Sequence, residues 1–306
     1  MATRRQFLML SATIGAAASL NIPFAQATTS SDISSGASAA VNEGTIKITQ
    51  VRNATLIVEY AGIKFLVDPY LAKKEAYPGF PGTFNDKLRN PRVDLKTPME
   101  TILDVNAVIV THTHNGNPHG DHWDKAAAEL VPKHLPIFAQ NEADAERIKA
   151  QGFKNVNVLS SNTLFRGVTL SWTAGRHGSE EAEKIGFSDL GDVCGVIFRK
   201  NGEKTLYLTG DTRWNSFVAH SLNKYKPDII VMNAGFAIVP GIGGIIMGCE
   251  DVCEVAHAAP DAKLIASHLE AVNHATVTRT ELRKYAEIVE ISDRLHIPED
   301  GETFYV

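Results

Sequence analysis

The stretch from Thr111 to Asp124 constrains this chain more than any other feature. It reads THTHNGNPHGDHWD, directly follows the apolar run Ala107–Val110, and holds four of the chain's 11 histidines and two aspartates, Asp121 and Asp124.

 Two asparagines, Asn115 and Asn117, lie between His114 and His119. Neutral imidazole and carboxylate groups bind divalent transition metals, and the end of a buried strand holds such ligands rigidly. The stretch therefore predicts a metal site at a strand end.

The amino terminus has the order of an export signal. Arg4 and Arg5 precede a weakly apolar, uncharged run that extends to Leu20, and an Ala-Gln-Ala sequence ends at Ala27. Residues 1–27 thus predict a signal peptide, and the paired arginines resemble the twin-arginine type. The apolar run is too short and too mild to span a bilayer well. We expect export by the twin-arginine machinery to the periplasm or the medium, with no stable membrane anchor after cleavage.

The segment after the signal reads as a tether. Residues 28–42 are rich in Ser, Ala and Thr and hold almost no large apolar residue, which is typical of a flexible linker. The remainder is long enough for one large domain or two small ones. The formal net charge is −5, without a long basic run. That balance argues against nucleic acid as a partner and leaves a small molecule as the expected substrate.

The three cysteines are an odd set for an exported protein. Cys249 and Cys253 stand four residues apart in an expected helix, a spacing that suits a disulfide poorly. We expect these two and Cys194 to be small buried side chains, with a thiolate metal ligand as the alternative.

Hydrophobic patterning predicts a β-rich start followed by mixed strands and helices. The expected strands are 45–51, 54–58, 64–67, 107–111, 136–140, 155–158, 168–173, 195–199, 204–208, 228–232, 263–267 and 303–305. The expected helices are 122–130, 142–151, 251–258 and 277–289. The first three strands have the spacing of an antiparallel meander, and Asn201-Gly202 favours a hairpin. This order indicates sheets covered by helices.

Two segments do not fit that pattern. Residues 71–97 carry many Pro, Gly, Asn and Lys, so we expect a long surface loop, and loops of that length are functional or mobile. Residues 236–247 are apolar and Gly-rich but lack the Lys-Ser/Thr of a phosphate loop. They predict either a buried helix entry or an apolar wall of the substrate pocket.

Polar motifs follow four of the expected strands. They are the His/Asp cluster after Val110, His177 in AGRHG, Asp211 in TGDT, and His268 in SHLE. Strand ends in layered α/β folds are where ligand sites are built.

The order of these motifs resembles the metallo-β-lactamase superfamily. Its signature is His-x-His-x-Asp-His after a strand, then a lone His, an Asp and a final His. The matching residues here are His112, His114, Asp121, His122, His177, Asp211 and His268. The resemblance covers residues 43–306 and implies a single α/β domain, a four-layer αββα sandwich of two mixed sheets face to face with helices outside. The sequences THTH, DHWD and SHLEAVNH look most like the broad branch that includes ascorbate-lactone hydrolases and phospholipase D-type enzymes.

The spacing departs from the signature at one point. Six residues, from Asn115 to Gly120, separate His114 from Asp121, where the family has one. Because the insert ends in His119-Gly120-Asp121-His122, either His114 or His119 takes the second ligand position. Register with His112 favours His114, and His119 would then face substrate or solvent. If His119 binds instead, His114 becomes a supporting residue.

The resemblance implies two divalent metal ions. One ion would be held by His112, His114 and His177, the other by Asp121, His122 and His268, with the Asp211 carboxylate bridging both. Zinc is the first expectation from these ligand types, and manganese or iron also fits. A hydroxide held between the two ions would be the nucleophile. The expected catalytic residues are Asp121, Asp211 and His274.

Four residues near these motifs have two interpretations each. Asp68 either orients a metal-binding histidine, as in the family, or caps the turn before Pro69. Asp124 either supports a ligand or bonds the amino terminus of a helix. His274 either donates a proton to the leaving group or is a surface histidine, and Glu270 is similarly open.

The expected function is an exported metal-dependent hydrolase that cleaves a lactone, ester or phosphodiester bond. Two alternatives stay open, an iron-dependent oxidoreductase on the same fold and a non-catalytic metal-binding protein. An antibiotic-hydrolysing β-lactamase is disfavoured because the resemblance is to the broader branch.

Overall fold

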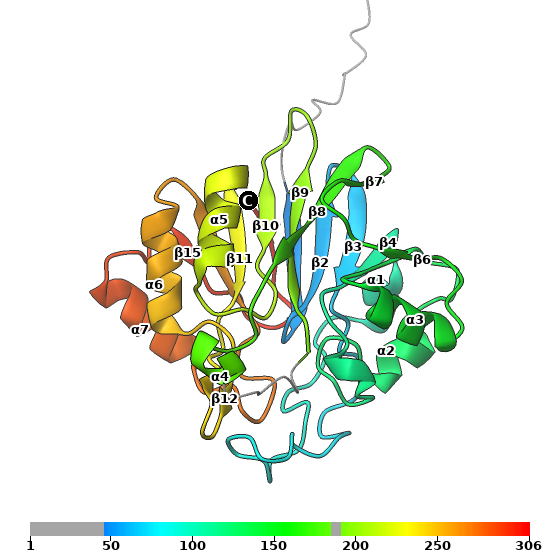
Figure 1. Cartoon of the computed structure of the whole chain (residues 1–306), viewed down its shortest axis with the longest axis horizontal. Coiled ribbons are helices and arrows are strands. Elements are labelled where there is room, and N and C mark those ends of the chain that lie inside the picture. The colour runs from blue at the N-terminus through cyan, green and yellow to red at the C-terminus, as the bar shows by residue number, and fades with distance from the viewer. Residues whose placement is uncertain (1–45, 185–190) are drawn as a thin grey trace, which may run out of the picture. The chain divides into compact units, whose positions relative to one another are not determined.

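Two seven-stranded sheets carry the fold of residues 46–184 and 191–306, the part of the chain described in the computed structural model (Figure 1). The expected signal peptide, residues 1–27, and tether, residues 28–42, lie outside the described residues. Among the described helices, none combines the length and the hydrophobicity needed to cross a bilayer.

The first sheet is antiparallel at one side and parallel at the other. In spatial order its strands are β16 (Thr303–Tyr305), β1 (Lys47–Arg52), β2 (Thr55–Tyr60), β3 (Ile63–Val67), β4 (Ala107–Val110), β5 (Ile137–Ala139) and β6 (Val156–Val158). The pairs from β16 to β3 are antiparallel, which confirms the predicted meander. The pairs from β3 to β6 are parallel, so the carboxyl ends of β3 and β4 lie at one edge.

The second sheet repeats this division. Its strands in spatial order are β15 (Leu295–His296), β14 (Lys263–Ser267), β11 (Ile229–Asn233), β10 (Leu206–Leu208), β9 (Cys194–Arg199), β8 (Val168–Ala174) and β7 (Thr163–Phe165). The predicted hairpin is confirmed as β9 and β10. Strands β8 and β10 both run antiparallel to β9, and β10, β11 and β14 run parallel to one another. The carboxyl ends of β8, β10, β11 and β14 therefore lie at the same edge of the sheet.

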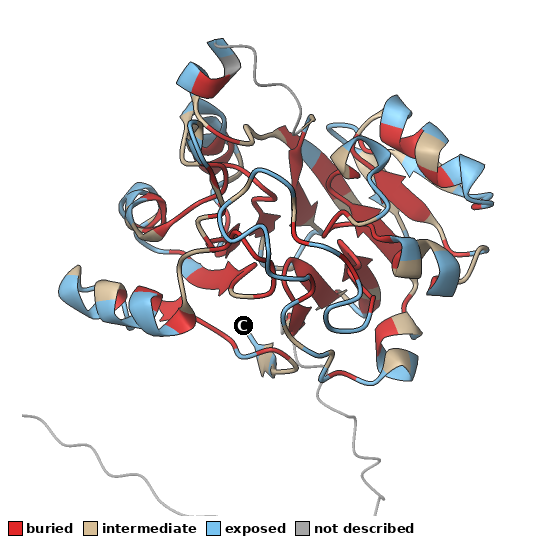
Figure 2. Cartoon of the chain, turned by 90° about the horizontal axis from the view of Figure 1, so that it is seen from below, coloured by how far each residue is buried: buried red, intermediate tan, exposed pale blue. Residues whose placement is uncertain are grey.

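The sheets face each other across an apolar core, and helices cover the outer faces. The core joins residues of both sheets, and the rings of Phe65 and Phe198 meet edge to face at 5.2 Å. Helices α1 (Met99–Leu103), α2 (Lys125–Leu130) and α3 (Glu142–Ala150) pack beside the first sheet, and α5 (Ser216–Tyr225), α6 (Cys249–Ala258) and α7 (Arg279–Ile288) beside the second. Figure 2 shows the buried strands between helices whose outer surfaces are exposed. The four-layer αββα prediction is confirmed.

Several element predictions needed correction. The helix expected from residue 122 begins at Lys125, because the Asp124 side chain caps it by accepting from the amide of Ala127. Helices α1 and α5 were not expected. In α5 only Val218, Ser221 and Leu222 are buried, a stripe too narrow to give a clear helical pattern in the sequence. The elements α4 (Glu180–Lys184), β7 and β15 were not predicted either, because each is only two to five residues long.

The Gly-rich segment contains a small ribbon that the sequence did not predict, β12 (Ile238–Val239) paired with β13 (Gly243–Gly244). Beyond the ribbon, residues 245–247 are buried and lead to Gly248, the amino-terminal cap of α6. The last part of the segment is therefore a buried entry to helix α6, which was one of the two interpretations.

The 71–97 loop contains no helix or named strand, as predicted, but its start is tied down. The fully buried Arg52 donates to the carbonyls of Tyr70, Ala72 and Val93, the last two at 3.0 and 3.1 Å. The Asp124 carboxylate accepts from the amide of Ala72 at 2.9 Å. Burial of a guanidinium group is costly unless its donors are paired, and both terminal nitrogens of Arg52 donate to carbonyls here. This end of the loop is therefore part of the core rather than a free surface segment.

Candidate metal centre

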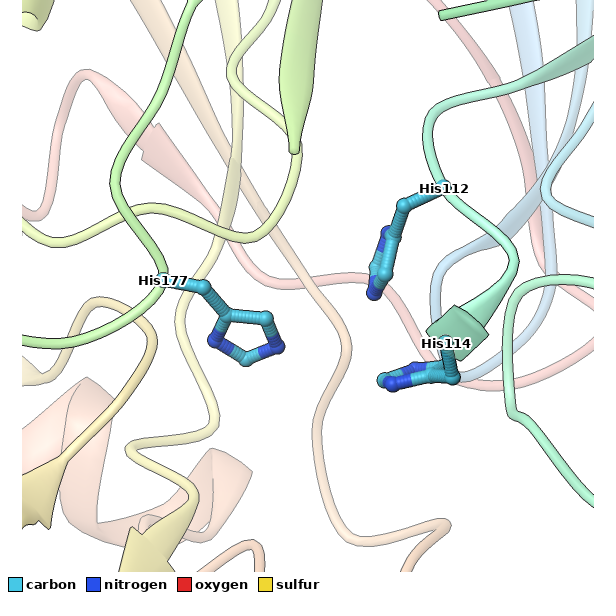
Figure 3. A group of neighbouring side chains, drawn as sticks. All are labelled: His112, His114 and His177. Atoms are coloured by element: carbon cyan, nitrogen blue, oxygen red, sulfur yellow. The ribbon is translucent and has the colours of Figure 1, made fainter. Parts of the chain in front are cut away.

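Histidines from both sheets converge at the edge where the strands end. His112 and His114 follow β4, and His177 follows β8. Ligand nitrogens of all three lie within 4.8 Å of one another. Figure 3 shows His177 facing the other two across the gap between the sheets. This spacing suits a single bound cation, as the sequence predicted for these three residues.

Two further groups share members with this one. Ligand atoms within 4.8 Å of one another are also offered by His112, His122 and Asp211, and by His114, Asp121 and His122. His268, which follows β14, joins them through its Nε2, which is 3.1 Å from Asp121 Oδ2. All seven residues of the signature therefore meet in one buried cluster.

Asp121 lies between two of these histidines. Its Oδ1 is 2.9 Å from His114 Nε2, and Asn53 Nδ2 donates to its Oδ2 at 2.7 Å. Burial raises the pKa of a carboxyl, but the hydrogen bonds of His114 and His268 prevail and hold the pKa of Asp121 well below its ordinary value. The group is a carboxylate at neutral pH.

Asp211 occupies the middle of the cluster. Its Oδ2 is 3.1 Å from His122 Nε2 and 3.6 Å from both His177 Nε2 and His268 Nε2. Its Oδ1 accepts from Asn233 Nδ2 at 2.6 Å. Burial again opposes ionisation, yet the charges of His122 and His268 lower the pKa of Asp211 well below its ordinary value. One carboxylate within reach of histidines from both sheets suits the predicted bridging position.

Asp68 supports His122 from behind. Asp68 Oδ2 is 2.9 Å from His122 Nδ1, and the same carboxylate accepts from the amide and the hydroxyl of Thr111, each at 2.7 Å. Metal-binding histidines commonly carry such a carboxylate on the ring nitrogen away from the ion. Of the two interpretations of Asp68, this geometry favours the orienting role.

The insert separates His114 from His119. His114 lies in a short 3₁₀ turn, His114–Gly116, where three consecutive residues have positive φ. The ring of His119 instead stacks on Tyr77, with centroids 4.6 Å apart and planes 20° apart. His119 belongs to none of the three ligand groups found among the described residues. The structure thus brings His114 to the cluster and places the ring of His119 against Tyr77 of the 71–97 loop.

His274 is buried next to the cluster rather than on the surface. Burial lowers its pKa to about 4, and its Nδ1 has no hydrogen-bond partner within the described part of the chain. The edge of its ring meets Phe80 at 5.1 Å. The interpretation as a surface histidine is therefore wrong.

The donor atoms fit a divalent metal ion. His112 Nε2 and His177 Nε2 are buried and have no hydrogen-bond partner among the described residues. Burial lowers the pKa of His112 well below its ordinary value and that of His177 to about 4, so both imidazoles are neutral and can donate a lone pair. His177 is also oriented, because its Nδ1 donates to the carbonyl of Ile245 at 2.9 Å. Buried unpaired nitrogens beside two carboxylates are what a cation site requires.

Other candidates lie elsewhere. Glu270 accepts from Arg279 Nη1 at 2.6 Å, and Asp124 caps α2 instead of supporting a ligand. All three cysteines are free, and none belongs to the ligand groups of the described residues. Cys194 is buried as predicted, whereas Cys249 and Cys253 are only partly so.

The sequence interpretation missed the two asparagines that hold the carboxylates. Asn53 occupies the turn between β1 and β2, and Asn233 is the last residue of β11. Asn233 could have been predicted, because it is a polar residue at the end of the apolar strand 229–233, and candidate ligands follow the other strands that end in this way. Asn53 gave no such signal, because asparagine is common in turns.

Comparisons with known proteins identify the family. No protein-family model matches the chain. The UPF0173 protein YddR of Bacillus subtilis is 46% identical over 260 residues, which cover 85% of this chain and 99% of that protein. The chain belongs to the UPF0173 family. A relative from Brucella ovis, 26% identical over 67% of this chain and 78% of that protein, is named a UPF0173 metal-dependent hydrolase.

Solved structures agree with this assignment. A structure of an isothiocyanate hydrolase from Delia radicum gut bacteria is 47% identical, with a TM-score of 0.80, and the alignment covers 85% of this chain and 100% of that chain. The metallo-β-lactamase fold protein YhfI from Bacillus subtilis aligns with a TM-score of 0.55 at 16% identity over 86% of this chain and 100% of that chain, which shows the fold alone. This UPF0173 member is thus a metal-dependent hydrolase with the metallo-β-lactamase fold.

Proposed function

We propose that this protein hydrolyses small isothiocyanates at a centre of two divalent cations. The observation that carries the proposal is the convergence of His112, His114 and His177 on one point, with Asp211 between the histidines of both sheets. The substrate class is supported by the 47% identity to a chain named isothiocyanate hydrolase, which is covered over its whole length.

The proposed reaction consumes one isothiocyanate and one water molecule and needs no other reactant. Water adds to the central carbon of R–N=C=S, so that a C–O bond forms and the C=N π electrons move to nitrogen, which takes a proton. The resulting thiocarbamate breaks its C–N bond, and nitrogen takes the second proton. The products are the amine R–NH₂ and carbonyl sulfide. Two cations at this site would supply a hydroxide at neutral pH and neutralise the charge that develops on the substrate.

Seven residues of the chain would hold the two cations. His112, His114 and His177 would hold one cation, Asp121, His122 and His268 the other, and Asp211 would contact both. Zinc is the proposed metal, because imidazole and carboxylate ligands suit it. Asn53 and Asn233 fix the two carboxylates through hydrogen bonds of 2.7 and 2.6 Å. Such fixed contacts keep the ligand oxygens in place before a cation binds.

His274 is the proposed partner of the substrate nitrogen. It is neutral at pH 7, since its pKa is about 4, and a neutral imidazole can donate a hydrogen bond and pass on a proton. Its buried, unpaired Nδ1 is available for that contact among the described residues.

The test is a substrate screen on protein of known metal content. Purified protein is analysed for transition metals and assayed with methyl, allyl and benzyl isothiocyanate, a γ-lactone, a nitrophenyl ester and a phosphodiester. We expect two zinc ions per chain and turnover of the isothiocyanates, lost by about 1000-fold or more in Asp211→Asn. Asp261→Asn, an exposed aspartate away from the cluster, is the matched control. Fully loaded protein that cleaves only the lactone, ester or phosphodiester would replace the isothiocyanate proposal with that bond class, and bound iron with oxygen consumption would favour the oxidoreductase.

We also propose that the protein is exported by the twin-arginine route. The support is the sequence of residues 1–27, with Arg4 and Arg5 before a mild apolar run. A fusion of this segment to a folded reporter should reach the periplasm, and replacement of both arginines by lysine should retain the reporter in the cytoplasm. Export that continues in the double-lysine fusion would contradict the route.

A further inference from the structure

A buried asparagine fixes the 71–97 loop next to the candidate metal centre. Asn273 is fully buried and uses its whole side-chain amide. Its Oδ1 accepts from the amide of Phe80 at 3.1 Å and from Asn90 Nδ2 at 2.7 Å. Its Nδ2 donates to Thr83 Oγ1 and to the carbonyl of Phe84, both at 2.8 Å. A fully paired buried amide sets one conformation of the segment around it.

The loop is also tied to the ribbon on the other side. The amide of Phe84 donates to the carbonyl of Ile238 at 3.2 Å, and the amide of Ile238 donates to the carbonyl of His274 at 2.9 Å. The loop, the β12–β13 ribbon and His274 are therefore linked through backbone hydrogen bonds. A long loop that would otherwise move is held at both sides of Phe80.

This arrangement holds the ring of Phe80 against two histidines of the site. The Phe80 ring centroid is 5.1 Å from that of His274 and 6.2 Å from that of His114. His114 in turn is 2.9 Å from Asp121. Phe80 is only partly buried, so part of the residue remains accessible. An aromatic face in that position can contact the apolar part of a bound molecule.

We propose that Phe80 is a specificity-determining residue that favours substrates with an arylalkyl group, and that Asn273 is the positioning residue that holds it there. The substrate class rests on the proposed function, whereas the contact of an aromatic group with Phe80 does not. In benzyl and phenethyl isothiocyanate, one or two methylene groups separate a phenyl ring from the isothiocyanate nitrogen. Methyl isothiocyanate lacks a ring and serves as the internal reference.

The first experiment measures kcat/KM for phenethyl and methyl isothiocyanate and compares their ratio between variants. Phe80→Ala should lower the phenethyl-to-methyl ratio by about tenfold, the loss expected for one aromatic contact. Phe84→Ala is the matched control, since it removes the same side chain from the same loop at a position that is 47% exposed. It should keep the wild-type ratio. An unchanged ratio in Phe80→Ala would overturn the proposal.

The second experiment does not depend on turnover. Calorimetric binding of 2-phenylethanethiol and ethanethiol to zinc-loaded protein compares an aryl and an alkyl probe whose thiolates both bind zinc. The wild type should prefer the aryl thiol by about tenfold, and Phe80→Ala should lose that preference. A wild type that converts no isothiocyanate but shows this preference would refute the proposed substrate and uphold the role of Phe80. Equal affinities for both thiols in the wild type would overturn that role.

The third experiment separates positioning from general stability. Asn273→Ala should lower the phenethyl-to-methyl ratio like Phe80→Ala, and the double variant should show no further decrease, because Asn273 acts through Phe80. Thr83→Val removes one of the four hydrogen bonds of the Asn273 amide and also the bond of 2.7 Å that Thr83 Oγ1 donates to the Phe80 carbonyl. It should lower the ratio by about twofold, so it provides the test if Asn273→Ala fails to fold. Independent, multiplicative effects of Asn273→Ala and Phe80→Ala would contradict the positioning role, as would a wild-type ratio in Thr83→Val.

Discussion

The Asp68 carboxylate lies 2.9 Å from Nδ1 of His122, on the side of the ring opposite the cluster. Nε2 of the same ring is 3.1 Å from Asp211. Asp68 therefore favours a proton on Nδ1 and leaves Nε2 as the donor atom toward a cation. The residue follows β3 with a φ of 45°, so the chain adopts an uncommon backbone conformation at the position of this carboxylate.

Asp68→Asn should weaken zinc binding by about 10- to 100-fold, because the amide no longer supplies a charged acceptor for His122. Competition with a zinc chelator at equilibrium measures this affinity. Asp104→Asn, which removes an exposed carboxylate paired with Lys64, is the control and should bind zinc like the wild type. Wild-type affinity in Asp68→Asn would show that Asp68 only supports the turn.

The two histidines of the insert should differ in their effect on metal content. His114→Ala removes a member of two ligand groups and should lower the bound metal to about one ion per chain or less. His119→Ala removes a ring that stacks on Tyr77 and should retain the wild-type metal content. Elemental analysis of both purified variants decides between them, and the reverse result would assign the second ligand position to His119.

Metal-free protein should lose stability as the pH falls below about 6.5. Burial lowers the pKa of His177 and of His274 to about 4, against an ordinary value of 6.5. Between these values the unfolded chain binds more protons than the folded one, so the free energy of unfolding decreases toward acid, by up to about 3 kcal/mol per group.

The comparison that isolates one group is urea unfolding of chelator-treated wild type and His274→Gln at pH 6.5 and 4.5. The variant should lose less stability over this interval, since it lacks one of the histidines with a lowered pKa, whereas His112 and His177 are present in both proteins. His122 and His268, whose pKa values are raised, are present in both proteins and act in the opposite direction. An equal loss in both proteins would contradict a depressed pKa of His274.

Removal of the metal should both abolish turnover and lower the melting temperature. A ligand that binds only the folded state stabilises it by about 2.7 kcal/mol at 100 times its Kd. Thermal unfolding with a chelator, and again after zinc is restored, measures this change. The Asp211→Asn variant should gain less from zinc than the wild type. A chelated protein with unchanged stability and activity would rule out a metal-dependent mechanism.

The sequence predicted the strand ends better than the segments between them. His112, His177, Asp211 and His268 each follow an apolar strand, and strands that share a direction end at one edge, so their convergence follows from the topology. Helix α5 gave little signal, because its buried side is narrow. The hydrophobic pattern of a sequence shows which face of a helix or strand is apolar, and it does not distinguish a weakly amphipathic helix from a loop.

The position of the insert could not be read from spacing. Both His114 and His119 fit a ligand motif, and the difference between them depends on Tyr77, which lies in the 71–97 loop. That loop is fixed in turn by Asn273, far along the chain. Contacts between distant segments of this kind leave no periodicity in either segment, so neither the loop's conformation nor the ligand choice was predictable from the sequence.

The distribution of the ligands over the two sheets has a mechanical consequence. His112 and His114 extend from the first sheet, and His177 extends from the second. A cation bound by all three would act as a cross-link between the two halves of the sandwich, in a chain whose cysteines are all free. The edge that forms the metal centre would then also stabilise the packing of the two sheets against each other.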